Sequence, residues 1–186
     1  MFVGSKVTLR SLELSDLEPI MAHWNTLELR KFLGPVVPHS REERECWIRK
    51  TWDERRKGTA YTFAIEDNAT HQFLGTCALK NVRPTNRSAE VSLAIYDPAN
   101  RGLGYGTDAL QLLLQYGFNY LNLHRVGLSV FYTNEQALKV YERVGFRKVG
   151  VKRHTDFIDG QYFDDVIMDI LEDEWKSRPF SANNPA

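Results

Sequence analysis

The chain has 186 residues, 42% of them hydrophobic, which suffices for one sizeable core and is short for two domains. Lysine plus arginine equals aspartate plus glutamate at 24 each, so no global field favours nucleic acid. No apolar run reaches membrane-spanning length, no signal-peptide pattern opens the chain, and Cys46 and Cys77 form no disulfide framework. We therefore expect a cytoplasmic protein with one domain over residues 1–175 and a flexible tail over residues 176–186.

Strand-like and helix-like segments alternate along the chain. Strands are expected over residues 6–10, 60–66, 73–80, 89–95, 125–131, 149–157 and 162–171. Helices are expected from residues 15–16 to 24, 40 to 57, 107 to 121 and 134 to 144. Ser40-Arg41-Glu42-Glu43 is a capping-box pattern, and Asp159-Gly160 suits the turn of a hairpin. These segments predict an α/β protein in which a mixed sheet is flanked by helices.

A glycine-rich turn, Arg101-Gly102-Leu103-Gly104-Tyr105-Gly106-Thr107, lies between the fourth expected strand and the third expected helix. Glycines let the backbone approach a ligand closely and bend into a concave nest. The start of a helix leaves backbone N–H groups unpaired and adds the positive end of the helix dipole. This turn is therefore expected to bind phosphate groups.

Two common nucleotide-binding patterns do not fit this turn. A phosphate-binding loop of the ATPase kind needs Gly-Lys-Ser/Thr after its glycines, and no lysine stands here. The dinucleotide fingerprint needs a third glycine at Thr107 and an acidic residue about twenty positions later, where residues 123–126 offer none. The remaining pattern, Arg-x-x-Gly-x-Gly after a strand, resembles the pyrophosphate loop of the GNAT superfamily of acyl-CoA-dependent N-acyltransferases.

The resemblance extends over residues 6–175. Asn134-Glu135-Gln136-Ala137 and Tyr141-Glu142-Arg143-Val144-Gly145-Phe146 look like the segment in which GNAT enzymes place a second helix beside the cofactor. Val7-Thr8-Leu9-Arg10 and Phe32-Leu33-Gly34-Pro35 look like the N-terminal part of the RimJ/RimL-like branch. The resemblance implies the GNAT fold, a single central, mostly antiparallel mixed sheet flanked by helices, and transfer of an acetyl group from acetyl-CoA to an amine.

The resemblance also implies which residues bind acetyl-CoA. At the end of the strand, backbone groups of Ala94, Ile95 and Tyr96 are expected to pair with the amides of pantetheine. The pyrophosphate is expected to bind Gly102, Gly104, Gly106 and Thr107. Arg101 occupies a motif position whose main chain lines the loop, although its side chain could simply face solvent. No metal is expected, because the five histidines show no zinc-ligand spacing.

Three residues are candidates for catalytic roles. Tyr141 fits a buried aromatic by spacing alone, whereas similar enzymes carry here a tyrosine that protonates the departing thiolate. Asn134 suits a helix N-cap and, in similar enzymes, binds the pantetheine arm or orients the reacting groups. Glu90 is either the base that accepts the amine proton through water or an acid on a solvated strand face.

The acceptor stays open at this stage. Similar enzymes shape the acceptor pocket with residues in the region of Trp24, Asn25 and Phe32, although Trp24 also fits a buried helix stripe. A protein or peptide N-terminus, a polyamine and an aminoglycoside all fit, with an acidic pocket favouring a polycation. The alternatives are a non-catalytic acyl-CoA-binding module and, less in keeping with zero net charge, a nucleic-acid-associated protein. We expect a monomer or homodimer with no nucleic-acid or membrane partner.

Overall fold

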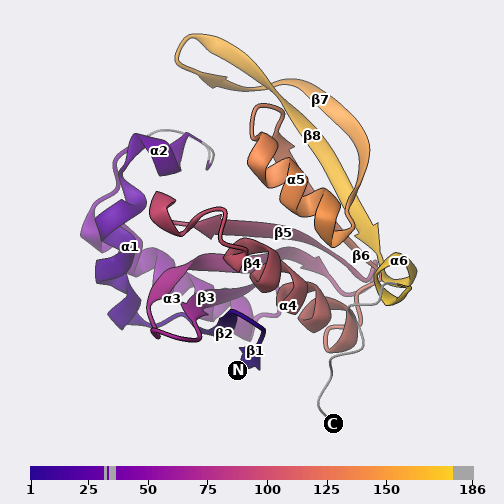
Figure 1. Cartoon of the computed structure of the whole chain (residues 1–186), viewed down its shortest axis with the longest axis horizontal. Coiled ribbons are helices and arrows are strands. Elements are labelled where there is room, and N and C mark those ends of the chain that lie inside the picture. Colours follow the sequence, from indigo (N-terminus) through magenta and orange to yellow (C-terminus); the bar gives the residue numbers. More distant parts are fainter. Residues whose placement is uncertain (32, 34–36, 178–186) are drawn as a thin grey trace.

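In the computed structural model, which describes residues 1–31, 33 and 37–177, eight strands form one sheet in the order β1-β2-β3-β4-β5-β6-β8-β7 (Figure 1). The strands are β1 Phe2–Val3, β2 Val7–Ser11, β3 Tyr61–Asp67, β4 Phe73–Arg83, β5 Ser88–Ile95, β6 Arg125–Phe131, β7 Arg147–Ile158 and β8 Gln161–Leu171. The helices are α1 Leu17–Trp24, α2 Leu27–Arg30, α3 Arg41–Arg56, α4 Tyr105–Asn119, α5 Glu135–Val144 and α6 Glu172–Lys176, with short 3-10 helices η1 Leu14–Asp16 and η2 Pro98–Asn100. The expected mixed, mostly antiparallel sheet flanked by helices is confirmed.

One parallel pairing interrupts an otherwise antiparallel sheet, and it determines where a ligand can enter. β5 and β6 pair only at Ser88–Glu90 with Arg125–Gly127, although β5 continues to Ile95 and β6 to Phe131. Beyond Glu90 the two strands no longer pair, so the facing backbone groups of both lack a strand partner. The sheet is therefore split along its middle.

Each face of the sheet has its own apolar core. Helices α4 and α5 cover one face, where Leu110, Leu113 and Val144 pack with apolar residues of the strands. Helices α1 and α3 cover the other face, where Ile20 and Ile48 are fully buried. Alternation of side chains along the strands supplies apolar residues to both faces at once. The split in the sheet therefore lies between two packed layers.

Local signals predicted most helix ends. The capping box is present, since Ser40 Oγ accepts from Glu43 N at 3.1 Å and Ser40 N donates to a Glu43 carboxylate oxygen. Helix α4 starts at Tyr105, two residues earlier than expected, because Gly104 adopts a left-handed N-cap conformation with φ of 91°. Asp16 does not cap α1 through its side chain, which instead receives two hydrogen bonds from the Arg10 guanidinium, at 2.9 and 2.7 Å.

Four short elements went unpredicted. They are β1, α2, α6 and the 3-10 helix η2, which span between two and five residues each, too short for a periodic pattern to show. Lys176, the first residue of the expected tail, belongs to α6, and its ammonium pairs with Glu172 at 2.6 Å. Residues 178–186 and the Phe32, Gly34 and Pro35 positions of the N-terminal motif lie outside the described residues. In the described part of the chain, no helix is long and apolar enough to span a membrane.

Candidate functional site

A cavity of about 540 Å³ fills the split between β5 and β6. Its walls are the end of β5, the glycine-rich turn, the first turn of α4, the end of β6 and one side of α5, together with residues of α2, β7 and β8. Nine residues expected at the site line it, namely Ala94, Ile95, Arg101, Gly102, Gly104, Gly106, Thr107, Asn134 and Tyr141. The structure thus brings together residues that are up to 47 positions apart in the sequence, from Ala94 to Tyr141.

The glycine-rich turn presents backbone donors to this cavity. The first intrahelical bond of α4 runs from Asp108 N to Gly104 O at 3.1 Å, so the N–H groups of Tyr105, Gly106 and Thr107 precede it and have no helical partner. Gly102 and Gly104 hold φ angles of 78° and 91°, which side-chain-bearing residues rarely adopt. Together with the helix dipole, these donors suit an anionic group such as a diphosphate.

The Arg101 side chain does not simply face solvent. Its guanidinium donates to Ile95 O and Tyr96 O, both at 3.1 Å, and lies 3.6 Å from a carboxylate oxygen of Glu28 on α2. Arg101 therefore fastens the start of the turn to the end of β5 and to α2. The backbone carbonyls of Ile95 and Tyr96 are occupied by these bonds.

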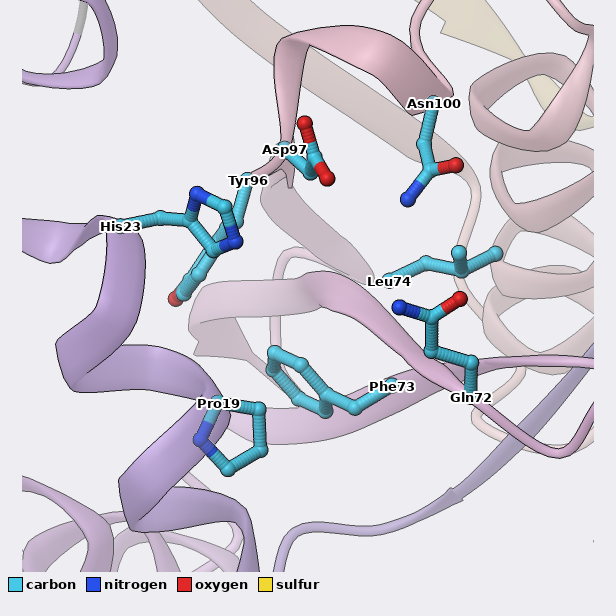
Figure 2. A pocket seen from close by; sticks show the side chains of 8 residues that line it. All are labelled: Pro19, His23, Gln72, Phe73, Leu74, Tyr96, Asp97 and Asn100. Carbon is cyan, nitrogen blue, oxygen red and sulfur yellow. The ribbon is translucent and has the colours of Figure 1, made fainter.

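Tyr96 departs from its expected role. Its backbone N–H donates to Leu74 O at 2.9 Å, its carbonyl accepts from Arg101, and Tyr96 does not line the main cavity. Its side chain is 2% exposed, and burial raises the pKa of the hydroxyl to about 12. Tyr96 instead lines a second, smaller cavity of about 230 Å³ with His23, Phe73, Asp97 and other residues (Figure 2).

Alternation along β5 identifies which backbone groups face the main cavity. The carbonyl of Ala94 lies on the β4 side, because a Cβ added to Gly75 of β4 would be 2.0 Å from it. Successive residues of a strand direct their backbone groups to opposite sides, so the N–H groups of Leu93 and Ile95 face the open side. Leu93, which was not expected at the site, lines the cavity, whereas the backbone groups of Ala94 face the paired strand β4.

Tyr141 and Asn134 both come from α5. Tyr141 is 9% exposed, its ring packs edge-on against Phe146 at 5.6 Å, and it also lines the cavity. Burial raises its pKa to about 12, so the phenol is a protonated donor at neutral pH. Asn134 caps the helix, accepting from Ala137 N at 3.2 Å, and lines the cavity as well. The position of Tyr141 is therefore compatible with both core packing and proton donation, and that of Asn134 with both helix capping and cofactor contact.

Glu90 is not part of this site. It lies at the last paired position of β5 with β6, below the point where the strands part, and it does not line the cavity. Its side chain is exposed and accepts a hydrogen bond from Asn81 Nδ2 at 2.8 Å. Strand alternation correctly put Glu90 on the face opposite Val91, but the depth of the split was not readable from the sequence. The structure favours the solvated strand-face alternative.

The described residues expected to shape the acceptor pocket do not line the main cavity. Trp24 stacks with Trp47 at 6.1 Å, lies 4.3 Å from the buried Arg44 guanidinium, and packs, partly buried, against the core beneath α1 and α3. Both polar groups of the Asn25 side chain bond to the backbone of His39 at 2.9 Å. Phe32 lies outside the described residues.

Acidic side chains from α2 and from the β7–β8 hairpin line the cavity instead. Asp165 on β8 accepts from Ser129 Oγ of β6 at 2.6 Å, and Asp156 of β7 and Glu28 of α2 also line it. The basic lining residues, Arg101, Lys139 and Arg143, come from the turn and from α5. The acidic lining residues therefore come from α2, β7 and β8, and the basic ones from the glycine-rich turn and α5. Among the described residues, no three His, Cys, Asp or Glu side chains gather as metal ligands.

Comparison with known proteins agrees with this geometry. A family model described as an acetyltransferase (GNAT) domain matches residues 6–147. The spermidine N(1)-acetyltransferase of Vibrio cholerae is 30% identical over 176 residues, covering 95% of this chain and 99% of that protein. The putative ribosomal N-acetyltransferase YdaF of Bacillus subtilis is 33% identical over 179 residues, covering 94% and 96%.

The similarity holds in three dimensions. A crystal structure of spermidine N-acetyltransferase from Vibrio cholerae in complex with CoA and spermine superposes with a TM-score of 0.84 at 30% identity. The match covers 93% of this chain and 99% of that one. With a family model over more than half of its length and relatives aligned nearly end to end, the chain belongs to the GNAT family and is an N-acetyltransferase.

Proposed function

We propose that this enzyme acetylates a primary amine of a polycation, such as a polyamine, with acetyl-CoA as the acetyl donor. The observation that carries the proposal is the acidic side of the cavity, lined by Glu28, Asp156 and Asp165. Carboxylates beside a reacting amine attract a second ammonium group on the same molecule. One relative supports this choice, since the Vibrio cholerae enzyme is a spermidine acetyltransferase and a crystal structure of spermidine N-acetyltransferase from that organism holds CoA and spermine.

The residues divide the work in the proposed reaction. The N–H groups at the start of α4 hold the diphosphate of acetyl-CoA, and those of Leu93 and Ile95 hold its pantetheine arm. The acceptor amine attacks the thioester carbonyl directly and loses a proton to solvent water, and the C–S bond of the tetrahedral intermediate then breaks. Tyr141 gives its phenolic proton to the departing thiolate. Asn134 contacts the pantetheine arm beside it.

The proposal also covers the domain, the cellular location, the branch of the family and the assembly. We infer one catalytic domain over residues 1–175 acting in the cytoplasm without a metal, in a branch close to the RimJ/RimL-like enzymes. The ribosomal relative is what supports that branch. For assembly, the expected monomer or homodimer must be weighed against the Vibrio cholerae enzyme, which has a dodecameric structure. Light scattering after gel filtration decides between them.

Thiol release from acetyl-CoA with separate pools of polyamines, aminoglycosides and N-terminal peptides tests the acceptor class. We expect release above background with polyamines. Asp165→Asn should raise the KM for the polyamine about tenfold, since a carboxylate within the cavity is neutralised. Asp164→Asn is the matched control, because Asp164 is its neighbour on β8, does not line the cavity and accepts from His154 N. Release with peptides alone would contradict the proposal and favour a ribosomal-protein type of acceptor.

A further inference from the structure

The turn between β1 and β2 is bonded to the first turn of α4, about 100 residues later in the chain. The Asp108 carboxylate accepts from the backbone N–H groups of Ser5, Lys6 and Val7 at 3.2, 2.8 and 3.0 Å. Asp108 is only 9% exposed, and its position in the first turn of the helix suits a negative charge. The backbone of residues 5–7 is therefore fixed against the start of α4.

This contact places the Lys6 ammonium against the glycine-rich turn, on the side away from the cavity. Lys6 Nζ donates to Leu103 O at 2.6 Å, and Leu103 lies between the two left-handed glycines, Gly102 and Gly104. A Cβ added to Gly104 would lie 3.1 Å from Lys6 Nζ, so the ammonium packs directly on the turn. Lys6 does not line the cavity and thus acts from outside it.

Hydrogen bonds from Tyr105 and Asn68 also connect the end of β3 to this contact. Tyr105 Oη donates to Asp67 Oδ2 at 2.7 Å, which joins the turn to the end of β3. The next residue, Asn68, donates from its side chain to Gly4 O at 2.9 Å and from its backbone to Lys6 O at 3.0 Å. The β1–β2 turn, the end of β3 and the start of α4 are therefore linked in a ring of hydrogen bonds.

We propose that Lys6 is a positioning residue for the binding of the acetyl-CoA diphosphate, an inference that rests on the proposed function. A turn with two left-handed glycines has many accessible backbone conformations when free. The ammonium holds the Leu103 carbonyl on the side away from the cavity, which keeps the following N–H groups directed into it. Its charge also adds to the positive potential at the start of α4.

Hydrogen–deuterium exchange in the absence of ligand tests the positioning directly. Lys6→Met removes the donor and the charge from an exposed side chain, so the fold should be retained. We expect faster exchange in the peptide covering residues 101–106 and unchanged exchange in α5. Lys57→Met, which removes another exposed ammonium at the end of α3, should leave the turn unchanged. Equal exchange in Lys6→Met and the wild type would overturn the proposal.

Binding titrations separate this role from a general loss of stability. Lys6→Met should weaken CoA binding about tenfold, because the turn must then be ordered on binding and one positive charge behind it is lost, while pantetheine, which lacks the diphosphate, should bind as it does to the wild type. Lys6→Gln supplies a neutral donor on a shorter side chain, so its affinity for CoA should lie between those of the wild type and Lys6→Met. Unchanged CoA affinity, or an equal loss for pantetheine, would contradict the proposal. If the wild type bound no CoA, the proposed function would be refuted. The exchange experiment would still test whether Lys6 orders the glycine-rich turn.

Discussion

Tyr141 is the single residue on which the proposed chemistry depends most. Its phenol is buried, reaches the cavity and, within the described residues, takes part in no side-chain hydrogen bond. We expect Tyr141→Phe to keep CoA affinity and to lower kcat about 10–1000-fold, the range for a lost general acid. Single-turnover kinetics with calorimetric CoA titration measure the two effects separately.

The control and the pH profile sharpen this prediction. Tyr132→Phe removes the hydroxyl of a tyrosine that is 62% exposed and lies outside the cavity, and kcat should not change. Because burial raises the pKa of Tyr141 to about 12, the proton remains on the phenol throughout the neutral range. The wild-type kcat should therefore show no alkaline decline below about pH 10. A decline near pH 8 that Tyr141→Phe abolishes would contradict the burial effect.

Glu90, unlike Tyr141, is expected to contribute little to catalysis. Its carboxylate is exposed, bonds to Asn81 and does not line the cavity. We expect Glu90→Gln to change kcat/KM by less than about threefold, since Gln retains an oxygen acceptor for Asn81. Steady-state kinetics from pH 6 to 9 check this. A loss of about a hundredfold that does not shrink towards high pH would return Glu90 to the role of general base.

At the scale of elements, Gly75 on β4 permits the close approach of β5 beside the cavity. A Cβ at Gly75 would lie 2.0 Å from Ala94 O, a backbone atom that cannot move without shifting β5. We expect Gly75→Ala to lower the free energy of unfolding by about 1–3 kcal/mol, as overpacking does. Urea unfolding measures it.

A second glycine in the same sheet is the control for this prediction. Gly150 on β7 has no described atom within 4 Å of an added Cβ. Gly150→Ala should therefore change the free energy of unfolding by no more than about 0.5 kcal/mol. If both variants were equally stable, the close approach of β4 and β5 at Gly75 would not constrain the fold.

The elements also show what the sequence could and could not predict. The Ser40 capping box and the Asn134 cap were readable because their partners lie three residues away. Lys6 and Asp165 were missed because their contacts depend on which distant strands and helices become neighbours. The glycine-rich turn was found because glycine spacing is itself a local signal. The point at which β5 and β6 part, which excludes Glu90, depends on strand pairing alone.

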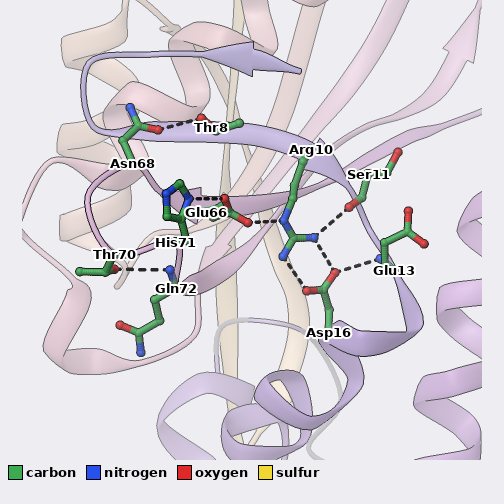
Figure 3. A network of polar contacts seen from close by, with 10 residues as sticks. All are labelled: Thr8, Arg10, Ser11, Glu13, Asp16, Glu66, Asn68, Thr70, His71 and Gln72. Atoms are coloured by element: carbon green, nitrogen blue, oxygen red, sulfur yellow. Dashed lines mark hydrogen bonds and ion pairs between the residues drawn. The ribbon is translucent and has the colours of Figure 1, made fainter.

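On the scale of the whole molecule, a network of polar contacts joins residues 8–16 with residues 66–72 (Figure 3). Arg10 on β2 lies 2.7 Å from Asp16 and 2.5 Å from Glu66 on β3, and Glu66 also contacts His71 Nδ1 at 3.1 Å. The Arg10 hydrogen bond is the largest cause that holds the pKa of Glu66 below its usual value. Hydrogen bonds likewise lower the pKa values of Asp67, bonded to Tyr105, and of Glu172, bonded to Lys176.

These lowered pKa values predict how stability changes with pH. A carboxylate whose pKa is lower in the folded state adds stability that is present above its unfolded pKa, about 4.3 for glutamate, and is lost as pH falls through the folded pKa. Glu66→Gln should therefore lower the free energy of unfolding by about 1 kcal/mol at pH 7, a value reduced for partial solvent exposure. The deficit should shrink towards pH 3, where the wild-type carboxylate becomes protonated as well. Urea unfolding at pH 7, 5 and 3 measures it, with Glu45→Gln as the control, since Glu45 is a half-exposed acid on α3 that pairs with Arg49 of the same helix. A deficit that stays constant across this range would show that packing at Glu66, rather than its charge, stabilises the junction of β2 and β3.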